Sequence, residues 1–486
     1  MGGLGAAGMP SRGPGAAGRW TRRGALRAGA GVLVAAGGAG LAACARAVGA
    51  AGATPSKPRT TLVWAPWRVA WGQGWDTVFL EAVQPFLQAN PGVDVRIDVS
   101  TGNGSNDGGT IPLIVAGAAP DVYSGYGPTK MIEGGYNLDL SPYLKEQNVD
   151  TSVWDAGQYQ KYVRNGSVWA LPAELSTSAV AVNEEMLDNA GLAYPDPAWD
   201  YTAAAALWRQ TTVHTATAAK DVTGFVFWGQ KASWLPGDFY LRGWGASAAQ
   251  SNFSALSGLD SAAAKTFAQW WYPLCQDGVI AWNGVAPSWP KQVACGFAGS
   301  WQLPAFAAQT SVKWDFWPQP AWPTGTSSYA GNDYYAVSST TAAPALAAAF
   351  AIWLTTDIQW QHSLMALQLV VPPSSKLWSA WVEVIGAVAP PLKAKNIQAF
   401  MTAPLQGRAF NHPAFAYDSD SAYALMSKYM PQIVAGKLDP IGGVTGAAQA
   451  VNAFEAAAAA EAAAVTSESK AFPATGHPIA AVATGV

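Results

Sequence analysis

The spacing of apolar and polar positions changes regularly along the first part of the chain. Thr60–Trp64 consists of two β-branched threonines and the apolar run Leu62-Val63-Trp64, which predicts a buried strand. Trp75–Ala89 places apolar residues at helical spacing. Val93–Val99 alternates as a half-buried strand does. A second helix over Thr110–Ala118 and a third strand over Pro120–Ser124 follow. This alternation of strands and helices predicts a parallel sheet covered by helices, an α/β fold.

The helical and strand spacings of apolar residues recur later in the chain. We expect further strands at Ser178–Asn183, Val293–Gly299 and Tyr334–Ser338, and helices at Glu184–Ala190, Ala262–Gln276, Ala342–Leu354 and Ala450–Val465. Roughly 400 residues follow position 60, which is too many for one core and suits two lobes. Residues 466–486 are rich in Ser, Thr, Pro and Gly and are expected to be a disordered tail.

The segment before the first strand resembles a bacterial export signal. Ala28–Ala43 is uncharged and too short to span a membrane, and basic residues precede it. The pair Arg22-Arg23 resembles a twin-arginine signal, and Leu41-Ala42-Ala43-Cys44 resembles a lipobox. We therefore expect residues 1–43 to be removed and Cys44 to carry lipid. Residues 44–59 would then form a flexible tether that holds the protein on the outer face of the cell membrane.

Charge and histidine usage narrow the possible partners. Removing the five arginines of residues 1–43 leaves 23 basic against 31 acidic residues, a net charge of −8. This balance argues against a nucleic-acid partner. The four histidines are scattered without ligand-like spacing, so we expect no metal site and no cofactor. No second long uncharged apolar stretch occurs, so no transmembrane helix is expected after the signal.

Cys275 and Cys295 remain once Cys44 is assigned to lipid. An even pair of cysteines in an oxidising compartment predicts a disulfide between them. Two separate buried thiols are the alternative.

Four groups of motifs give the chain a resemblance to a known family. They are Leu62-Val63-Trp64 with Asn90-Pro91-Gly92, then Gly117–Val122, then Trp169–Pro172 with Val182–Leu187, and last Gly299-Ser300-Trp301 with Tyr329-Ala330-Gly331. In order and spacing, from about residue 60 to 455, the chain resembles the extracellular solute-binding proteins of ABC importers, family 1, the maltose and multiple-sugar type. Asn332-Asp333 departs from the family pattern, which often has a second glycine there.

The resemblance implies a two-lobed periplasmic-binding-protein fold of the class II type, with discontinuous lobes joined by strands that cross between them. Lobe 1 would comprise residues 60–175 and 331–373, and lobe 2 residues 176–330 and 374–465. The crossings would lie near residues 174–179, near residues 329–333 and after residue 373. A solute held between the lobes would favour their closure. The implied protein is a monomer that is no enzyme and docks on the transmembrane permease subunits of an importer.

The 24 tryptophans suggest a carbohydrate, because aromatic rings cover the apolar faces of a sugar and polar side chains bind its hydroxyl groups. Trp353 and Trp360 are expected to be core residues. The residues expected to bind the solute lie at strand ends, at crossings or in a Trp-rich loop: Trp67, Trp71, Tyr126, Glu174, Trp228, Trp234, Asp238, Trp301, Asn332 and Asp333. Asp121 and Glu174 each have a structural alternative, as a strand-start residue and as a solvated hinge residue.

Three other functions compete with carbohydrate binding, and one of them is a scaffold or receptor lipoprotein that binds no solute. Aromatic residues combined with carboxylates also suit a cationic solute such as a polyamine. A membrane-anchored glycan hydrolase would need two carboxylates flanking one bond, a role that Glu174 and Asp333 could fill in principle. Their local sequence does not set one as acid and the other as base, so binding is the favoured function.

Overall fold

The structure is a computed structural model that describes residues 59–66, 75–98, 106–125, 131–132, 134–215, 221–226, 240–246, 261–281, 289–290, 292–325 and 328–410, with single positions between 428 and 453. The expected signal, Cys44, nearly all of the tether and the C-terminal tail lie outside these residues. Arg59, at the end of the expected tether, donates to the carbonyl of Val93 at 2.7 Å and pairs with Asp94 at 3.0 Å.

A ten-stranded mixed sheet organises the described part of the chain, in the order β2-β1-β3-β11-β6-β9-β7-β8, with β10 paired to β6 and β12 to β11. The strands are β1 Thr60–Ala65, β2 Val93–Ile97, β3 Val122–Gly125, β6 Leu171–Asn183, β7 Thr223–Val226, β8 Ile280–Ala281, β9 Val293–Gly299, β10 Trp314–Pro318, β11 Ser328–Val337 and β12 Ala409–Phe410. A separate hairpin pairs β4 Val163–Arg164 with β5 Ser167–Val168. Strands and helices alternate as the sequence pattern predicted, so the α/β prediction is confirmed.

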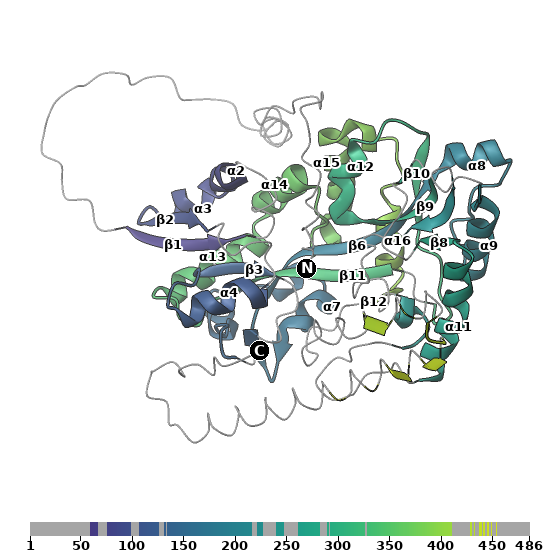
Figure 1. Ribbon diagram of the computed structural model, residues 1–486. Helices are drawn as coiled ribbons and strands as arrows, with labels where there is room; N and C mark the ends of the chain where they lie inside the picture. The colour runs from purple at the N-terminus through teal and green to yellow at the C-terminus, as the bar shows by residue number, and fades with distance from the viewer. Residues whose placement is uncertain are drawn as a thin grey trace, which may run out of the picture. The chain divides into compact units, whose positions relative to one another are not determined.

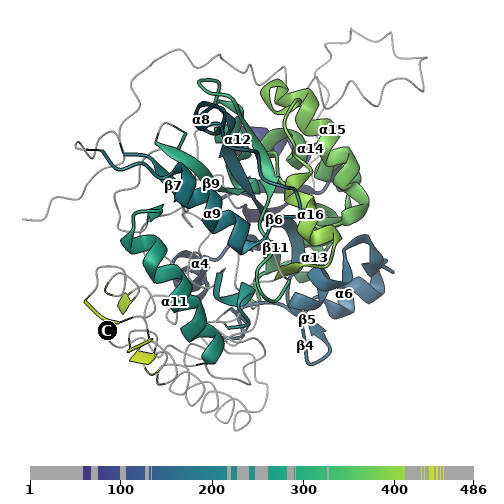
Figure 2. The same cartoon turned by 90° about the vertical axis from the view of Figure 1, so that its right-hand side faces the viewer.

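Helices cover this sheet. They are α2 Trp75–Ala82, α3 Gln84–Ala89, α4 Asn106–Val115, α6 Ser141–Glu146, α7 Ala156–Tyr159, α8 Glu184–Ala190, α9 Tyr201–Thr211, α11 Ala262–Gln276, α12 Leu303–Ala307, α13 Pro344–Thr356, α14 Ile358–Gln368, α15 Trp378–Val388 and α16 Ala399–Leu405. Short 3-10 turns are η2 Thr151–Val153, η3 Gln160–Tyr162, η6 Ser300–Gln302, η7 Ser375–Leu377 and η8 Pro390–Leu392. Figure 2 shows α13–α16, in green, gathered together beside β6 and β11.

Two long antiparallel strands, β6 and β11, link the two ends of the sheet (Figure 1). The first part of β6 pairs with β11, and its last part pairs with β9 and β10. The other end of β11 pairs with β3. Parallel strands lie on either side of this pair, β1 with β2 and β3, and β7 with β8 and β9. The described strands therefore form two parallel groups joined through β6 and β11, the strands that contain the first two crossings implied by the family resemblance.

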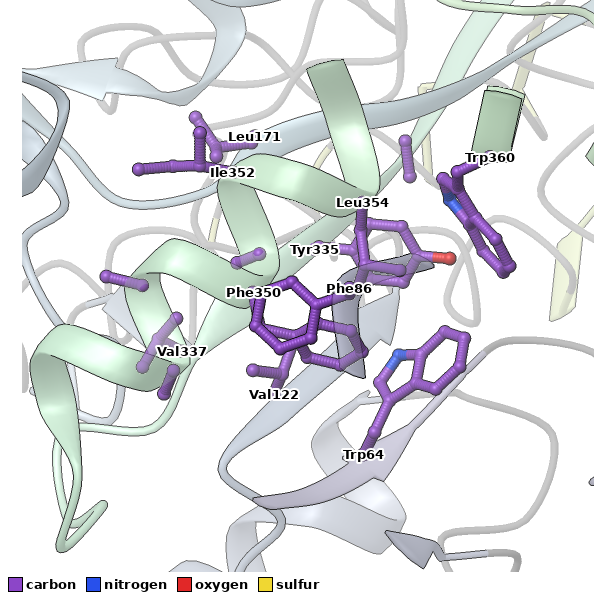
Figure 3. Close-up of a cluster of buried hydrophobic side chains, with 14 of the residues drawn as sticks. Trp64, Phe86, Val122, Leu171, Tyr335, Val337, Phe350, Ile352, Leu354 and Trp360 are labelled. Atoms are coloured by element: carbon purple, nitrogen blue, oxygen red, sulfur yellow. The ribbon is translucent and has the colours of Figure 1, made fainter. Parts of the chain in front are cut away.

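Aromatic residues pack the core beside β1 and β3. Trp64 is fully buried and meets Phe350 and Trp360 edge-on, at ring distances of 5.4 and 5.6 Å (Figure 3). Trp353 packs at the border of this cluster and stacks on Phe350. The expectation that Trp353 and Trp360 are core residues is therefore confirmed. Edge-on and offset rings contribute about 0.5–1.5 kcal/mol per pair beyond the area they bury.

A proline explains the one predicted helix that is divided. Residues 75–89 form α2 and α3, and Pro85 lies in the first turn of α3. Proline has no amide hydrogen to donate, so it is tolerated at the start of a helix and disrupts the interior. Asn183 and Gly191 bound α8 as expected: the Asn183 side chain accepts from the Met186 amide, and Gly191 closes the helix with a φ of 64°.

Candidate functional site

Two carboxylates lie opposite each other where β6 and β11 pair. Glu174 is the ladder partner of Asp333, and the register shifts directly after this pair. Directly opposed residues of an antiparallel pair point to the same face, with Cβ atoms about 5 Å apart. Glu174 is 7% exposed, whereas Asp333 is partly exposed. Like charges directly opposite each other in a sheet are unfavourable, so a positive charge near this pair stabilises it.

Lys161 places a positive charge beside this pair. It lies in η3, and its ammonium group donates to the carbonyl of Ala330 on β11 at 2.9 Å. Burial lowers the pKa of Lys161 from an ordinary 10.5 to about 7, although the negative charge of Asp333 opposes this shift. The sequence analysis missed Lys161. Its only local signal is a lysine between two tyrosines, Tyr159 and Tyr162.

The end of β9 comes next to β6 beyond the carboxylates. The Ser300 hydroxyl accepts a hydrogen bond from the amide of Thr177 at 3.1 Å, and both residues are buried. Trp301 follows in η6 and is partly exposed, with its ring 6.1 Å from that of Phe297. A Cβ atom on Gly299 would lie 2.4 Å from the Trp301 ring, so the glycine makes room for that ring.

A third segment reaches the same place from later in the chain. Leu175 forms an isolated antiparallel bridge with Val371, and its amide donates to the Val371 carbonyl at 2.8 Å. Leu369 ends α14 in the left-handed conformation, with a φ of 57°, and so turns the chain toward this bridge. The segment just before the expected third crossing thus contacts β6 beside Glu174.

The structure describes three of the ten expected solute-binding side chains. Glu174 and Asp333 lie together, and Trp301 follows a serine that is hydrogen-bonded to the same strand, β6. The remaining side chains lie outside the described residues: Trp67, Trp71, Tyr126, Trp228, Trp234, Asp238 and Asn332. The backbone of Asn332 is described and pairs with Leu175.

Asp121 has the structural role that was left open for it, that of a residue fixing the start of a strand. Its carboxylate accepts from the Val63 amide at 2.7 Å and from the Thr341 hydroxyl at 2.5 Å. Its backbone carbonyl accepts from Ser338. These bonds tie β3 to β1 and to the segment after β11, which accounts for an acidic residue at the start of this strand.

The predicted disulfide between Cys275 and Cys295 is wrong. Both cysteines are free and buried within one hydrophobic cluster between α11 and β9. Burial raises the pKa of Cys275 far above its ordinary value and that of Cys295 to about 12, while contact with Trp208 opposes the second shift. Each thiol is therefore a small apolar core residue, the alternative left open by the sequence.

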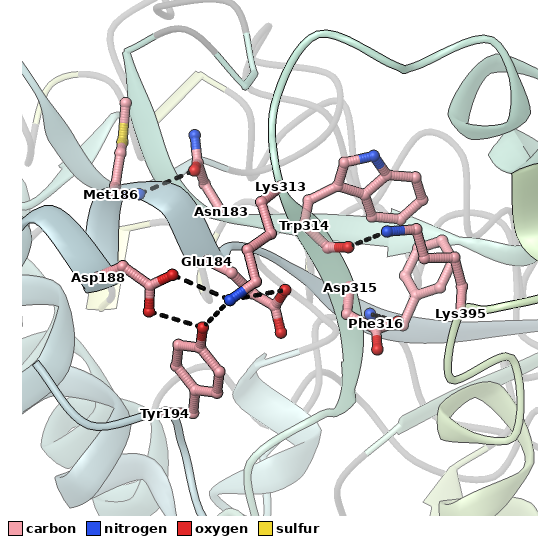
Figure 4. A network of polar contacts seen from close by, with 10 residues as sticks. All are labelled: Asn183, Glu184, Met186, Asp188, Tyr194, Lys313, Trp314, Asp315, Phe316 and Lys395. Carbon is pink, nitrogen blue, oxygen red and sulfur yellow. Dashed lines mark hydrogen bonds and ion pairs between the residues drawn. The ribbon is translucent and has the colours of Figure 1, made fainter.

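A second polar cluster joins α8 to β10. Lys313 lies 2.9 Å from Asp188 and 3.9 Å from Glu184, and Tyr194 donates to Asp188 at 2.6 Å (Figure 4). Lys313 and Asp188 are exposed to solvent. No group of three metal-binding side chains occurs among the described residues, and none of the described helices is long and apolar enough to cross a membrane.

Comparison with known proteins gives one family. The model of the bacterial extracellular solute-binding protein family matches residues 41–359, or 319 of the 486 residues. Among curated proteins, none matches the chain. The fold is similar to that of an ABC substrate-binding protein from Listeria monocytogenes in complex with cycloalternan. The TM-score is 0.65 and the identity 17%, over 81% of this chain and 98% of that one.

Two further solved structures show the same likeness. The cyclic alpha-maltosyl-1,6-maltose binding protein from Arthrobacter globiformis has a TM-score of 0.64 and 17% identity, over 82% of this chain and 99% of that one. The GacH receptor of Streptomyces glaucescens, solved unliganded and with acarbose, has a TM-score of 0.63 and 17% identity, over 82% and 99%. At this identity the likeness shows the fold, which is the two-lobed periplasmic-binding-protein fold predicted from the sequence.

Proposed function

The chain belongs to the family of bacterial extracellular solute-binding proteins, and we propose that it captures a carbohydrate between its two lobes and delivers it to the permease of an ABC importer. The observation that carries this proposal is the opposed pair Glu174–Asp333 on β6 and β11. Carboxylates accept hydrogen bonds from hydroxyl groups, and two at one crossing would orient a polyhydroxylated solute. The sugar ligands of the solved neighbours support the same solute class.

The lobe boundaries belong to this proposal. Lobe 1 comprises residues 60–175 and 331–373, and lobe 2 residues 176–330 and 374–465. Two observations support these boundaries: β11 pairs with Glu174 and Leu175, and Val371 bridges Leu175. A solute that touches both lobes binds the closed state more tightly than the open one and so drives closure.

Aromatic stacking completes the proposed site. Trp301 would offer a ring face to the sugar from the end of β9, and Trp67 or Trp71 would offer another. Asn332 and Tyr126 would line the same site, as would Trp228, Trp234 and Asp238 from the second lobe. Aromatic rings bury a large area at little conformational cost, which suits the apolar faces of a sugar ring.

Thermal-shift screening of the full chain tests the function. The panel contains mono- and oligosaccharides, polyols and polyamines, because a ligand that binds only the native state raises the melting temperature. A carbohydrate should raise it. Calorimetric titration should then show that Glu174→Gln lowers the affinity for that carbohydrate by about thirtyfold, because a charged hydrogen bond contributes about 2 kcal/mol.

Trp301→Ala and Trp353→Ala form a matched pair in the same experiment. The first should weaken binding, whereas the second removes a core ring and should lower stability by about 3 kcal/mol without changing affinity. Unchanged binding by both Glu174→Gln and Trp301→Ala would place the solute elsewhere. Stabilisation by no member of the panel would refute solute capture.

A polyamine is the second candidate solute, because the two opposed carboxylates would attract a cation. Stabilisation by polyamines and by no sugar would keep the site and change the solute class. Binding, rather than glycan hydrolysis, is the activity we propose in either case.

Lipid anchoring at Cys44 is a separate part of the proposal and rests on the lipobox-like sequence Leu41-Ala42-Ala43-Cys44. The mature protein would remain on the outer face of the membrane, held by residues 44–59. Expressed in a bacterium, the parent should fractionate with membranes, and Cys44→Ser should be released or remain unprocessed. A mature N-terminus other than a lipidated Cys44, measured by mass spectrometry, would contradict anchoring.

A further inference from the structure

Trp301 lies in a turn that is held by a hydrogen bond on either side of it. β9 ends at Gly299 beside β6, and the chain then turns into η6. The Gln302 side chain accepts a hydrogen bond from the Gly299 amide at 2.8 Å. The Ser300 hydroxyl accepts another from the Thr177 amide of β6 at 3.1 Å. Trp301 is the residue between Ser300 and Gln302, so both of its neighbours are fixed.

The hydrogen bond of Ser300 stands where the sheet ladder stops. β9 pairs with β6 only as far as Gly299, and the next amide of β6 toward Glu174, that of Thr177, meets the Ser300 hydroxyl in place of a strand carbonyl. Ser300 is 2% exposed and Thr177 is fully buried, so loss of this acceptor would leave a buried amide without its partner. The turn that carries Trp301 is therefore bonded to the strand that carries Glu174.

The surroundings of the Trp301 ring tie its orientation to that of the turn. A Cβ atom on Gly299 would lie 2.4 Å from the ring, so the ring packs closely against the glycine. The ring centroid lies 6.1 Å from that of Phe297, and Leu303, which follows η6, is fully buried in another hydrophobic cluster. A change in the backbone of this turn would therefore move the ring.

We propose that Ser300 and Gln302 are positioning residues that set the Trp301 ring for stacking on the solute. This inference rests on the proposed function, because it concerns the same site. Ser300 is buried, and the Gln302 oxygen is occupied by the Gly299 amide, so both residues act through Trp301. Stacking weakens when a ring is displaced or tilted, since the apolar area that it covers shrinks.

Fluorine NMR of the full chain labelled with 5-fluorotryptophan reads the environment of the ring without any sugar. The Trp301 resonance is the one that is absent from Trp301→Phe. Ser300→Ala and Gln302→Met each remove a hydrogen-bond acceptor, and each should shift or broaden that resonance. Ser300→Thr and Gln302→Glu keep an oxygen acceptor and should leave it as in the parent. Should Ser300→Ala fail to fold, Gln302→Met, at a half-buried position, carries the same expectation.

Calorimetric titration with maltose measures the consequence for binding. Gln302→Met should lower the affinity about fivefold, the effect expected for one neutral hydrogen bond. In a Trp301→Ala background the same substitution should have no further effect, because a residue that acts only through the ring has no influence once the ring is removed. If the thermal-shift screen selects another sugar, that sugar replaces maltose.

Ser141→Ala is the matched control. The Ser141 hydroxyl accepts from the Val168 amide at 2.8 Å, so a serine that begins a helix again holds the amide of a strand, here β5. Its replacement makes the same chemical change in a turn that does not carry Trp301. It should lower the melting temperature and leave both the Trp301 resonance and the maltose affinity unchanged.

An unmoved Trp301 resonance in both Ser300→Ala and Gln302→Met would overturn the inference. So would a loss of affinity from Gln302→Met that persists in Trp301→Ala, because Gln302 would then contact the solute itself. Failure of the proposed function would instead appear as a parent that no carbohydrate stabilises, while the fluorine spectrum would still decide whether the two residues position the ring. The two failures are therefore distinguishable.

Discussion

Two lysines of this protein have carboxylate neighbours and opposite pKa shifts. Lys313 lies at the surface beside Asp188 and Tyr194, and these hydrogen bonds raise its pKa well above the ordinary value (Figure 4). Lys161 lies beside Asp333 at the crossing strands, and burial lowers its pKa to about 7. A carboxylate neighbour is common to both, so hydration decides the direction of the shift.

The two lysines differ in their effect on the stability of the fold. The Lys313 cluster stays hydrated, and exposed pairs of this kind contribute little to stability. Lys161 makes the folded state less favourable whenever it is charged, because its ammonium group loses water on folding. A charge that costs stability at the junction of β6 and β11 supports the binding site proposed there, since perturbed groups concentrate at functional sites.

The largest expected effect comes from removing the acidic partner of each lysine. Asp333→Asn should lower the affinity for the carbohydrate found by screening by about thirtyfold, because a charged hydrogen-bond partner of the solute is lost. Asp188→Asn makes the same chemical change in the surface cluster and should leave affinity unchanged. Calorimetric titration compares them, and equal affinities would remove the distinction between the two regions.

Stability against pH gives the second test. Between pH 7 and pH 9 the unfolded chain keeps the Lys161 proton, whereas the folded protein, with its pKa of about 7, releases it. The unfolded state then binds more protons, so the free energy of unfolding gains a term that rises with pH. Lys161→Met should abolish this term, which amounts to about 1 kcal/mol per pH unit.

Lys313→Met is the counterpart. The raised pKa of Lys313 keeps it protonated in both states across the same pH window, so the effect of its replacement should not change with pH. Denaturant titrations at pH 7, 8 and 9 give the free energies. A constant difference between Lys161→Met and the parent would show that Lys161 keeps an ordinary pKa.

Local patterns in the sequence predicted more of the fold than of the site. Ala262–Gln276 and Val293–Gly299 have the predicted bounds because periodicity and the flanking residues define them locally. The family resemblance placed Glu174 and Asp333 at crossings, but their direct pairing was not predicted. Lys161 escaped prediction, because its partner lies far along the chain and only the folded sheet brings them together. The disulfide prediction failed because an oxidising compartment does not determine whether two cysteine side chains lie close enough to bond.

Gly299 offers a smaller perturbation that leaves both lysines in place. Gly299→Ala should displace the Trp301 ring, because the new Cβ atom would lie 2.4 Å from it. We expect about a fivefold loss of carbohydrate affinity, on the order of 1 kcal/mol. Gly386→Ala is the control: its Cβ atom would only touch Lys393 at 3.5 Å, and alanine favours the interior of α15. Equal affinity in both variants would mean that the position of Trp301 is immaterial to binding.

The smallest expected effect concerns two buried groups without a charged partner. Cys275 and Cys295 have raised pKa values because burial disfavours their thiolates, and neither forms a disulfide. In Cys44→Ser protein, a thiol reagent should therefore label neither cysteine in the native state and both after unfolding without reductant. Reductant should leave the melting temperature unchanged, since a disulfide closing this loop would contribute about 3 kcal/mol. Unfolded protein that takes up no label until it is reduced would restore the disulfide. It would also show that the core around α11 and β9 depends on an oxidising compartment.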